Sequence, residues 1–171
     1  EGLLARLGAG AEARDAGLMR AALEEAGAVG LPERDLCEVR RALASVEGLL
    51  AKLGDAARRH DAELLASALD EARAAGLLER DLEAATEAFT RLEKLRADLR
   101  AAVEGMDPDV LARVLDEAQA AGLPERDLYE ALLARGRAEQ MLAKLGAGVD
   151  CLDLGVLRAA LGECRASGLP E

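Results

Sequence analysis

Apolar residues recur along the chain at helical spacing, in two kinds of stripe that alternate. The first stripe comprises Leu18, Met19, Ala22, Leu23 and Ala26. The second comprises Leu36, Val39, Leu43, Val46, Leu50 and Leu53. Steps of three and four residues place such side chains on one face of a helix. The pattern therefore predicts pairs of amphipathic helices, here called helix A and helix B.

A Gly-Leu pair separates helix A from helix B at intervals of 46 residues. Its glycines are Gly30, Gly76, Gly122 and Gly168. The sequence Glu-Arg-Asp-Leu follows in the same phase at 33–36, 79–82 and 125–128. A fixed period of this length is typical of solenoids and other repeat arrays.

Start and stop signals recur with the same period. Aspartates that can cap helix A lie at Asp15, Asp61, Asp107 and Asp153. The side chain of Asp accepts backbone N–H groups of a first turn, and Pro108 suits the first helical position. The glycine of each Gly-Leu pair is expected to end helix A in the left-handed conformation. Pro32, Pro124 and Pro170 are expected to open helix B, with Leu78 at this position in the second copy.

Helix B is predicted to run from about residue 32 to about residue 53 and to be closed by a glycine. The closing glycines would be Gly8, Gly54 and Gly146. Arg100 replaces this glycine in the second copy, so that helix is predicted to continue to about Gly105.

The resulting domain prediction is one continuous array over residues 1–171. Its units are about 1–8 (partial helix B), 9–54, 55–100, 101–146 and 147–171 (partial). Residues 1–8 align with 47–54, so the chain is expected to begin inside a helix B. It ends in the first turn of another helix B, and we therefore expect a fragment of a longer array.

Two antiparallel helices in each repeat of 46 residues resemble the α-solenoid class, and HEAT and armadillo repeats are nearest in length. The resemblance is architectural and covers the whole chain. The Trp and Tyr signature of tetratricopeptide repeats and the Thr-Pro-Leu-His of ankyrin repeats do not occur. The resemblance implies stacked hairpins that offer a surface for binding other proteins.

Composition supports an all-α fold and narrows the partners. Ala, Leu, Glu and Arg favour helices, whereas the chain has one Tyr, one Phe and no Trp to favour strands. A net charge of -11 disfavours nucleic acid and anionic membranes as partners. No apolar run approaches the ~18 residues of a membrane-spanning helix. Other proteins are the expected partners.

Residues that could carry chemistry are few. Cys37, Cys151 and Cys164 follow no pattern and lack closely spaced metal ligands, which favours inert thiols in a reducing, intracellular compartment. His60 is the only histidine, and no phosphate-binding loop is present. The sequence therefore predicts no enzymatic activity, no cofactor, no metal and no small-molecule substrate.

Recurring charges allow two interpretations. Arg34, Arg80 and Arg126 recur in phase, as do the acidic pairs that begin at Glu24, Asp70 and Asp116, with Glu163 in the fourth copy. These charges could grip a repetitive partner such as a filament. The plainer alternative is a solvated face with exposed salt bridges, each contributing about 0–1 kcal/mol.

Departures from the repeat are further candidate partner contacts. Tyr129 is expected to be an exposed aromatic residue on helix B, either an interface anchor or a simple surface tyrosine. Arg135 occupies the stripe position of Leu43 and Phe89, and Gly136 follows it. The sequence suggests a locally rotated stripe there, or alternatively a bend or docking point.

The favoured hypothesis is a non-catalytic scaffold segment in a larger, cytoplasmic assembly, for example a cytoskeletal or ciliary one. The alternative is a regulatory or spacer arm of a multidomain enzyme whose catalytic domain lies outside this sequence. A designed consensus repeat is disfavoured by the irregular cysteines and by Arg135 and Gly136.

Overall fold

The computed structural model describes residues 2–151 and 154–167, and these residues form an all-α protein without strands. The helices are α1 (Gly2–Glu12), α2 (Ala16–Val29), α3 (Glu33–Arg58), α4 (Ala62–Ala74), α5 (Glu79–Gly105), α6 (Pro108–Ala120), α7 (Glu125–Asp150) and α8 (Leu154–Ser167). Three residues with predicted helix-end roles, Asp153, Gly168 and Pro170, lie outside the described residues.

The chain divides into two compact units, Glu1–Thr90 and Arg91–Glu171. The boundary falls inside α5, which contributes its first part to one unit and its second part to the other.

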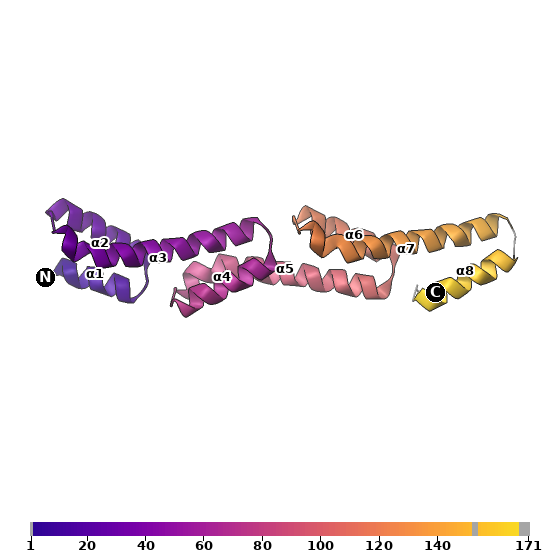
Figure 1. Ribbon diagram of the computed structural model, residues 1–171, viewed down its shortest axis with the longest axis horizontal. Helices are drawn as coiled ribbons and strands as arrows, with labels where there is room; N and C mark the ends of the chain where they lie inside the picture. The colour runs from indigo at the N-terminus through magenta and orange to yellow at the C-terminus, as the bar shows by residue number, and fades with distance from the viewer. Residues whose placement is uncertain (1, 152–153, 168–171) are drawn as a thin grey trace. The chain divides into compact units, whose positions relative to one another are not determined.

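In the first unit, the two parts of α3 pack against different helices. Its first part packs with α1 and α2, and its second part packs against α4 (Figure 1). An ion pair from Arg20 to Glu47 joins α2 to α3, and one from Lys52 to Glu71 joins α3 to α4. At 26 residues, α3 is about 39 Å long, enough to span both sets of contacts.

The second unit repeats this use of a long helix. The first part of α7 packs against α6, and its second part packs against α8 (Figure 1). Lys144 of α7 pairs with Glu163 of α8, at the positions that Lys52 and Glu71 occupy in α3 and α4.

The predicted glycine ends of helix A are confirmed. Gly30, Gly76 and Gly122 have φ angles of 75°, 77° and 75°, which an L side chain rarely adopts. The following leucine amide donates back to the last helical turn in each copy, as from Leu31 to the Ala26 carbonyl at 3.0 Å. This backbone pattern satisfies carbonyls that a helix end would otherwise leave unpaired.

The predicted aspartate caps are also confirmed at Asp15, Asp61 and Asp107. Their carboxylates accept hydrogen bonds from backbone amides in the first turns of α2, α4 and α6. Pro108 occupies the first turn of α6 as expected. Pro32 and Pro124 were predicted to be the first helical residues, but each is the extended residue immediately before its helix, α3 or α7.

The predicted glycine ends of helix B are wrong. Gly8, Gly54 and Gly146 lie inside α1, α3 and α7, and α3 and α7 extend to Arg58 and Asp150. A glycine inside a helix costs about 1 kcal/mol, which buried neighbours such as Leu53 and Ala56 can offset. Among the four helices B, which are α1, α3, α5 and α7, only α5 ends where the sequence predicted, at Gly105.

Left-handed residues other than glycine lie between helix B and the next helix A. Arg14, His60 and Met106 have φ angles of 53°, 51° and 50°, and each immediately precedes a capping aspartate. The connection from helix B to helix A is therefore a short, defined turn, whereas the glycine positions predicted a longer loop.

The core stripe of helix B differs from the prediction in part. Leu36, Val39, Val46 and Leu53 of α3 are buried as expected. Leu43 and Leu50 are only half-buried, and Leu49 and Ala56 are buried in addition. The predicted stripe followed one face, but α3 packs on different partners along its length, so its buried face widens.

The rotated stripe predicted near Arg135 is wrong. Leu132 and Leu133 are 37% and 43% exposed, whereas Leu128 and Ala131 are buried in the phase of Leu36 and Val39. The stripe of α7 thus keeps its register. Arg135 is tolerated because the equivalent position, Leu43 in α3, is itself at the edge of the core.

Candidate interaction surface

Exposed ion pairs join helix B to the next helix A at a constant separation of 19 residues. The pairs are Arg6–Glu25 at 2.7 Å, Lys52–Glu71 at 2.7 Å and Lys144–Glu163 at 2.6 Å. Each side chain is at least half exposed, so each pair contributes about 0–1 kcal/mol. In these copies the recurring glutamate has a partner within the chain, which supports the plainer interpretation of the acidic residues.

The second full copy departs from this arrangement. Asp98 stands at the position of Lys52, and Glu117 stands at the position of Glu71. Two acidic residues therefore replace a basic–acidic pair between α5 and α6.

Two of these ion pairs, Lys52–Glu71 and Lys144–Glu163, each border a shallow groove. Between α3 and α4 it has a volume of about 320 Å³, and its lining includes Lys52, Leu64, Ser67 and Glu71. Between α7 and α8 the equivalent groove has about 290 Å³, and its lining includes Lys144, Val156, Ala159 and Glu163. The same set of positions thus forms an open groove in both units.

An exposed apolar residue lines each groove, at the repeat position that Leu18 holds in the predicted stripe of helix A. Leu64 is 44% exposed and Val156 is 46% exposed, whereas Leu65, next to Leu64, is fully buried. Each groove therefore combines an apolar side chain with a lysine and a glutamate.

The three candidate arginines have similar local partners and different surroundings. Arg34, Arg80 and Arg126 each lie within 3.5–3.7 Å of the next aspartate in the chain. Arg80 also binds Asp15, which is 65 residues away. The side chain of Arg34 is 85% exposed, compared with 63% for Arg80.

Asp15 combines a cap and an ion pair in one buried carboxylate. The Leu18 amide donates to its Oδ1 at 3.0 Å, and Arg80 donates to its other oxygen. The Leu18 amide lowers the pKa of Asp15; burial opposes this shift, and Arg80 reinforces it. The carboxylate is therefore held ionised at the start of α2.

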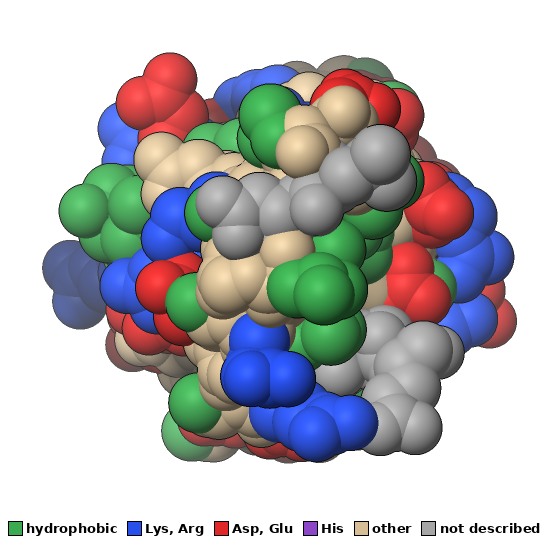
Figure 2. Space-filling view, turned by 90° about the vertical axis from the view of Figure 1, so that its right-hand side faces the viewer, with side chains coloured by type: hydrophobic (Ala, Val, Ile, Leu, Met, Phe, Trp, Pro, Cys, Tyr) green, Lys and Arg blue, Asp and Glu red, His purple; other side chains and the backbone are tan. Residues whose placement is uncertain are grey.

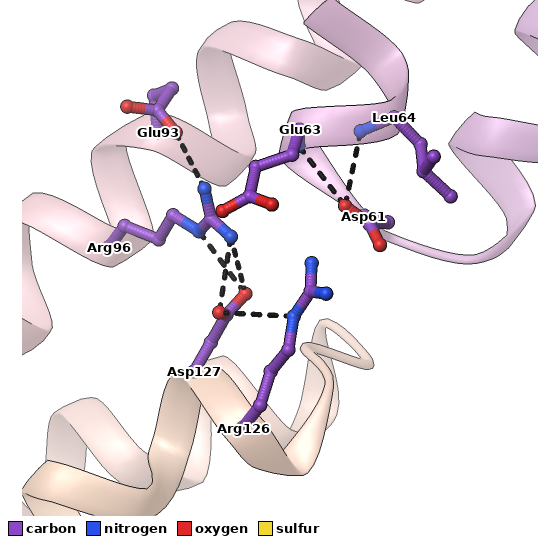
Figure 3. A network of polar contacts seen from close by, with 7 residues as sticks. All are labelled: Asp61, Glu63, Leu64, Glu93, Arg96, Arg126 and Asp127. Carbon is purple, nitrogen blue, oxygen red and sulfur yellow. Dashed lines mark hydrogen bonds and ion pairs between the residues drawn. The ribbon is translucent and has the colours of Figure 1, made fainter.

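A more buried network surrounds Arg96 in the second unit (Figure 3). The Arg96 Nη2 donates to both carboxylate oxygens of Asp127, at 2.9 and 3.1 Å, and its Nε donates to Asp127 at 3.1 Å. Glu93 accepts a further bond at 3.3 Å. The side chains of Arg96 and Asp127 are only 13% and 14% exposed. Burial would lower the pKa of Arg96, but Asp127 and Glu93 outweigh it and raise that pKa.

The remaining candidate contacts both lie on α7. Tyr129 is 61% exposed, which confirms its predicted place on the surface. The Arg135 Nε lies 3.3 Å from a carboxylate oxygen of Glu139, one helical turn along. Tyr129 and Arg135 belong to the second compact unit, whereas Arg34 and Arg80 belong to the first.

The described residues hold free cysteines and no cluster of metal-ligating side chains. Cys37 and Cys151 are exposed, Cys164 is buried, and none of the three forms a disulfide. Within residues 2–151 and 154–167, no three His, Cys, Asp or Glu side chains gather as a metal site would require. No helix in these ranges is both long and apolar enough to cross a membrane.

The sequence analysis did not single out Arg96 or the basic residues of the exposed ion pairs. Arg96 carries a signal in the sequence, since it replaces Leu50 and Leu142 of the neighbouring copies. Arg6, Lys52 and Lys144 also recur in phase. Their partners could not be deduced from the period alone, because the pairing depends on how the helices pack.

No family model, curated protein or solved structure matches the chain.

Proposed function

We propose that this chain is a non-catalytic structural segment, a helical repeat array of the α-solenoid type that binds other proteins within a larger assembly. The observation that carries the proposal is the recurrence of the groove at α3–α4 and α7–α8, with the same kinds of residue. A surface that recurs along an array suits a partner with repeated or extended contacts.

The composition of the grooves supports protein ligands in particular. Leu64 and Val156 supply exposed apolar area, which gains free energy when a partner covers it. The adjoining lysine and glutamate supply a hydrogen-bond donor and an acceptor at the rim, a common arrangement in protein interfaces. A cytoskeletal or ciliary assembly is one setting in which such an array would serve.

Cross-linking mass spectrometry on the intact native protein, in its own cell extract, tests the proposal. The chain has three lysines, and two of them, Lys52 and Lys144, line the grooves. Lys94 lies on α5 outside both grooves and serves as an internal comparison. We expect Lys52 and Lys144 to cross-link reproducibly to the same partner protein, and Lys94 to do so less often.

Cross-links confined to a catalytic domain of the same polypeptide would instead support the regulatory or spacer arm. A matched pair of variants separates groove binding from general effects. Ser67→Arg places a bulky charge in the α3–α4 groove, whereas Ser45→Arg makes the same change at an exposed position of α3 outside it. Loss of the cross-links in both variants, or in neither, would contradict binding in the groove.

A further inference from the structure

An exposed apolar patch lies on α7 where the other long helices carry mostly polar residues. The residues of this α7 patch are Tyr129, Leu132, Leu133 and Gly136. Spacings of three and four residues place them on one face of the helix, over two turns. The equivalent residues are Cys37, Arg40, Arg41 and Ala44 in α3, and Glu83, Thr86, Glu87 and Thr90 in α5. The patch therefore does not belong to the apolar stripe that every copy uses for packing.

The later helices of a unit do not cover this face. At the equivalent positions of α3, Cys37, Arg40 and Arg41 are exposed, although α4 and the first part of α5 follow in the same unit. Exposure alone is common in this protein. At the end of the second unit that faces the viewer in Figure 2, hydrophobic side chains are exposed among charged ones. The α7 patch differs because its apolar residues adjoin one another, as is typical of a binding surface.

Gly136 has no role in the packing of its own chain. It lies in the middle of α7, where a glycine costs about 1 kcal/mol relative to alanine. Beyond its own helical turn, no atom lies within 4 Å of a Cβ added at this position. Glycine is favoured where a group from outside must approach the backbone closely. We therefore infer that a bulky group of a partner occupies the space above Gly136.

The α7 patch is complementary to itself when two copies run in opposite directions. Tyr129 is its largest residue and Gly136 its smallest, and they lie at opposite ends with the two leucines between them. A second, antiparallel α7 places each Tyr129 ring over the Gly136 of the other copy. It also places the leucines of the two copies against each other. One two-fold axis through the middle of the patch makes both contacts at once.

Charges at one edge of the patch suit the same arrangement. Glu130 and Arg137 are exposed, and neither forms an ion pair within residues 2–151 and 154–167. They lie three residues before and four residues after Leu133, so both flank it on the helix surface. An antiparallel second copy brings the Glu130 of each helix to the Arg137 of the other, which gives two ion pairs of opposite charge. Arg126 lies on this edge too, but it is already near Asp127.

We propose that the α7 patch is a site of self-association, at which a second copy of this chain binds in antiparallel orientation. A stable interface has about 20–30 residues on each side, and the patch with its charged edge is much smaller. Each copy also carries a net charge of -11, which opposes association. The dimer is therefore weak, and it forms at high concentration or where an assembly holds copies close together. This inference goes beyond the proposed function, because the patch lies outside both grooves.

Sedimentation equilibrium of the intact chain tests the site directly. A reductant keeps the exposed Cys37 and Cys151 as thiols. We expect a monomer–dimer equilibrium between about 10 µM and about 1 mM protein. Leu133→Glu should weaken it about tenfold or more, because a charge then faces the apolar patch. Leu142→Glu makes the same change at an exposed leucine on another face of α7 and should leave it unchanged.

An exchange of residues tests the antiparallel arrangement. Tyr129→Gly removes the ring, and Gly136→Tyr places two rings in the same space, so each should weaken the dimer about tenfold. The double variant pairs a tyrosine with a glycine again and should restore it. In the same way, Glu130→Arg or Arg137→Glu alone should weaken the dimer about tenfold, and the two together should restore it. Circular dichroism shows whether each variant keeps its helix content.

Several outcomes would overturn the proposal. They are a chain that stays monomeric throughout, a dimer that Leu133→Glu leaves intact, and double variants as weak as their single changes. A monomeric chain would leave a different protein as the occupant of the patch. The cross-links of the scaffold proposal start from Lys52 and Lys144 in the grooves, so either proposal can fail while the other stands.

Discussion

Residues 50–52 and 96–98 occupy the same place in successive copies and use a basic residue in opposite ways. The first stretch is Leu-Ala-Lys and the second is Arg-Ala-Asp. Lys52 is 60% exposed and pairs with Glu71 of the following helix A. Arg96 is 13% exposed and pairs with Asp127 of the following helix B. Moving the positive charge by two positions takes it from the surface into the packed part of the molecule.

The comparison shows that the burial of a charged side chain, more than its presence, decides how much its loss would destabilise the protein. An exposed pair is screened by water and salt and contributes little. A desolvated pair need not add net stability, but loss of one partner leaves a buried charge without compensation. The second copy therefore depends on Arg96 in a way that the first copy does not depend on Lys52.

The largest effect is expected from Arg96→Ala. It leaves the Asp127 carboxylate largely buried without its main partner and should lower the free energy of unfolding by about 3 kcal/mol. Urea denaturation followed by circular dichroism measures the loss. Arg100→Ala removes an exposed arginine from the same helix and should change the free energy by less than about 0.5 kcal/mol. If the two substitutions lowered the free energy of unfolding equally, burial of the arginine would not determine its contribution.

A smaller effect is expected from Asp15→Asn, which keeps a capping oxygen but removes the charge that binds Arg80. We expect a loss of about 1–2 kcal/mol at pH 7. The loss should be smaller for Asp107→Asn, because no arginine among the described residues pairs with Asp107.

The loss from Asp15→Asn should depend on pH. The pKa of Asp15 is lowered in the folded state, so its ionised form stabilises the protein above the unfolded pKa of 3.8. This contribution disappears as the pH falls through the folded pKa. Urea denaturation of the original chain and of Asp15→Asn, at pH 7 and at pH 3, measures the difference between their free energies of unfolding. This difference should be smaller at pH 3, and an unchanged difference would argue against the ion pair.

Glycine substitutions in the turns that follow α3 and α5 should have the same effect on stability in the two copies. His60 and Met106 have nearly the same left-handed φ, which costs an L residue about 1 kcal/mol relative to glycine. His60→Gly and Met106→Gly should therefore each raise stability by up to about 1 kcal/mol, since glycine gives back part of the gain as chain entropy. Thermal unfolding measures both, and a fall in Tm for either would show that its side chain contributes more than the strain costs.

The smallest effect is expected from Asp98→Lys, which makes the second copy resemble the first. The introduced lysine could pair with Glu117 as Lys52 pairs with Glu71, for a gain of about 0.5 kcal/mol that diminishes in 1 M salt. Glu117→Lys should give a similar gain by reversing the pair. The double variant places two lysines together and should lose both gains, so additive gains in urea denaturation would show that the two positions do not interact.

Local features of the fold could be predicted from the sequence because their causes are local. The caps at Asp15, Asp61 and Asp107 depend on amides two or three residues away, and the turns at Gly30, Gly76 and Gly122 depend on backbone freedom at one residue. The ends of helix B were wrong for the opposite reason. Whether Gly54 ends a helix depends on the packing of Leu53 and Ala56, which the local sequence does not reveal.

The candidate surface was less predictable than the fold. The sequence singled out Tyr129 as exposed, and it is. It placed Leu18 in the apolar stripe, yet Leu18 and its repeat equivalent Leu64 are 54% and 44% exposed. A stripe shows which residues share a face but not how far a neighbouring helix covers that face. Arg96 shows the same limit, since its unusual residue type is visible in the sequence, whereas its partner is 31 residues away on another helix.

The continuity of α3 has a mechanical consequence. One unbroken helix belongs to the packing around α1 and α2 and also to the packing against α4, with no loop between them that could extend. Tension along its axis would pass through the helical backbone, so the two sets of contacts could move apart along that axis only if helical turns unwound. A helix shared in this way would resist small loads stiffly and lengthen in discrete steps under large ones.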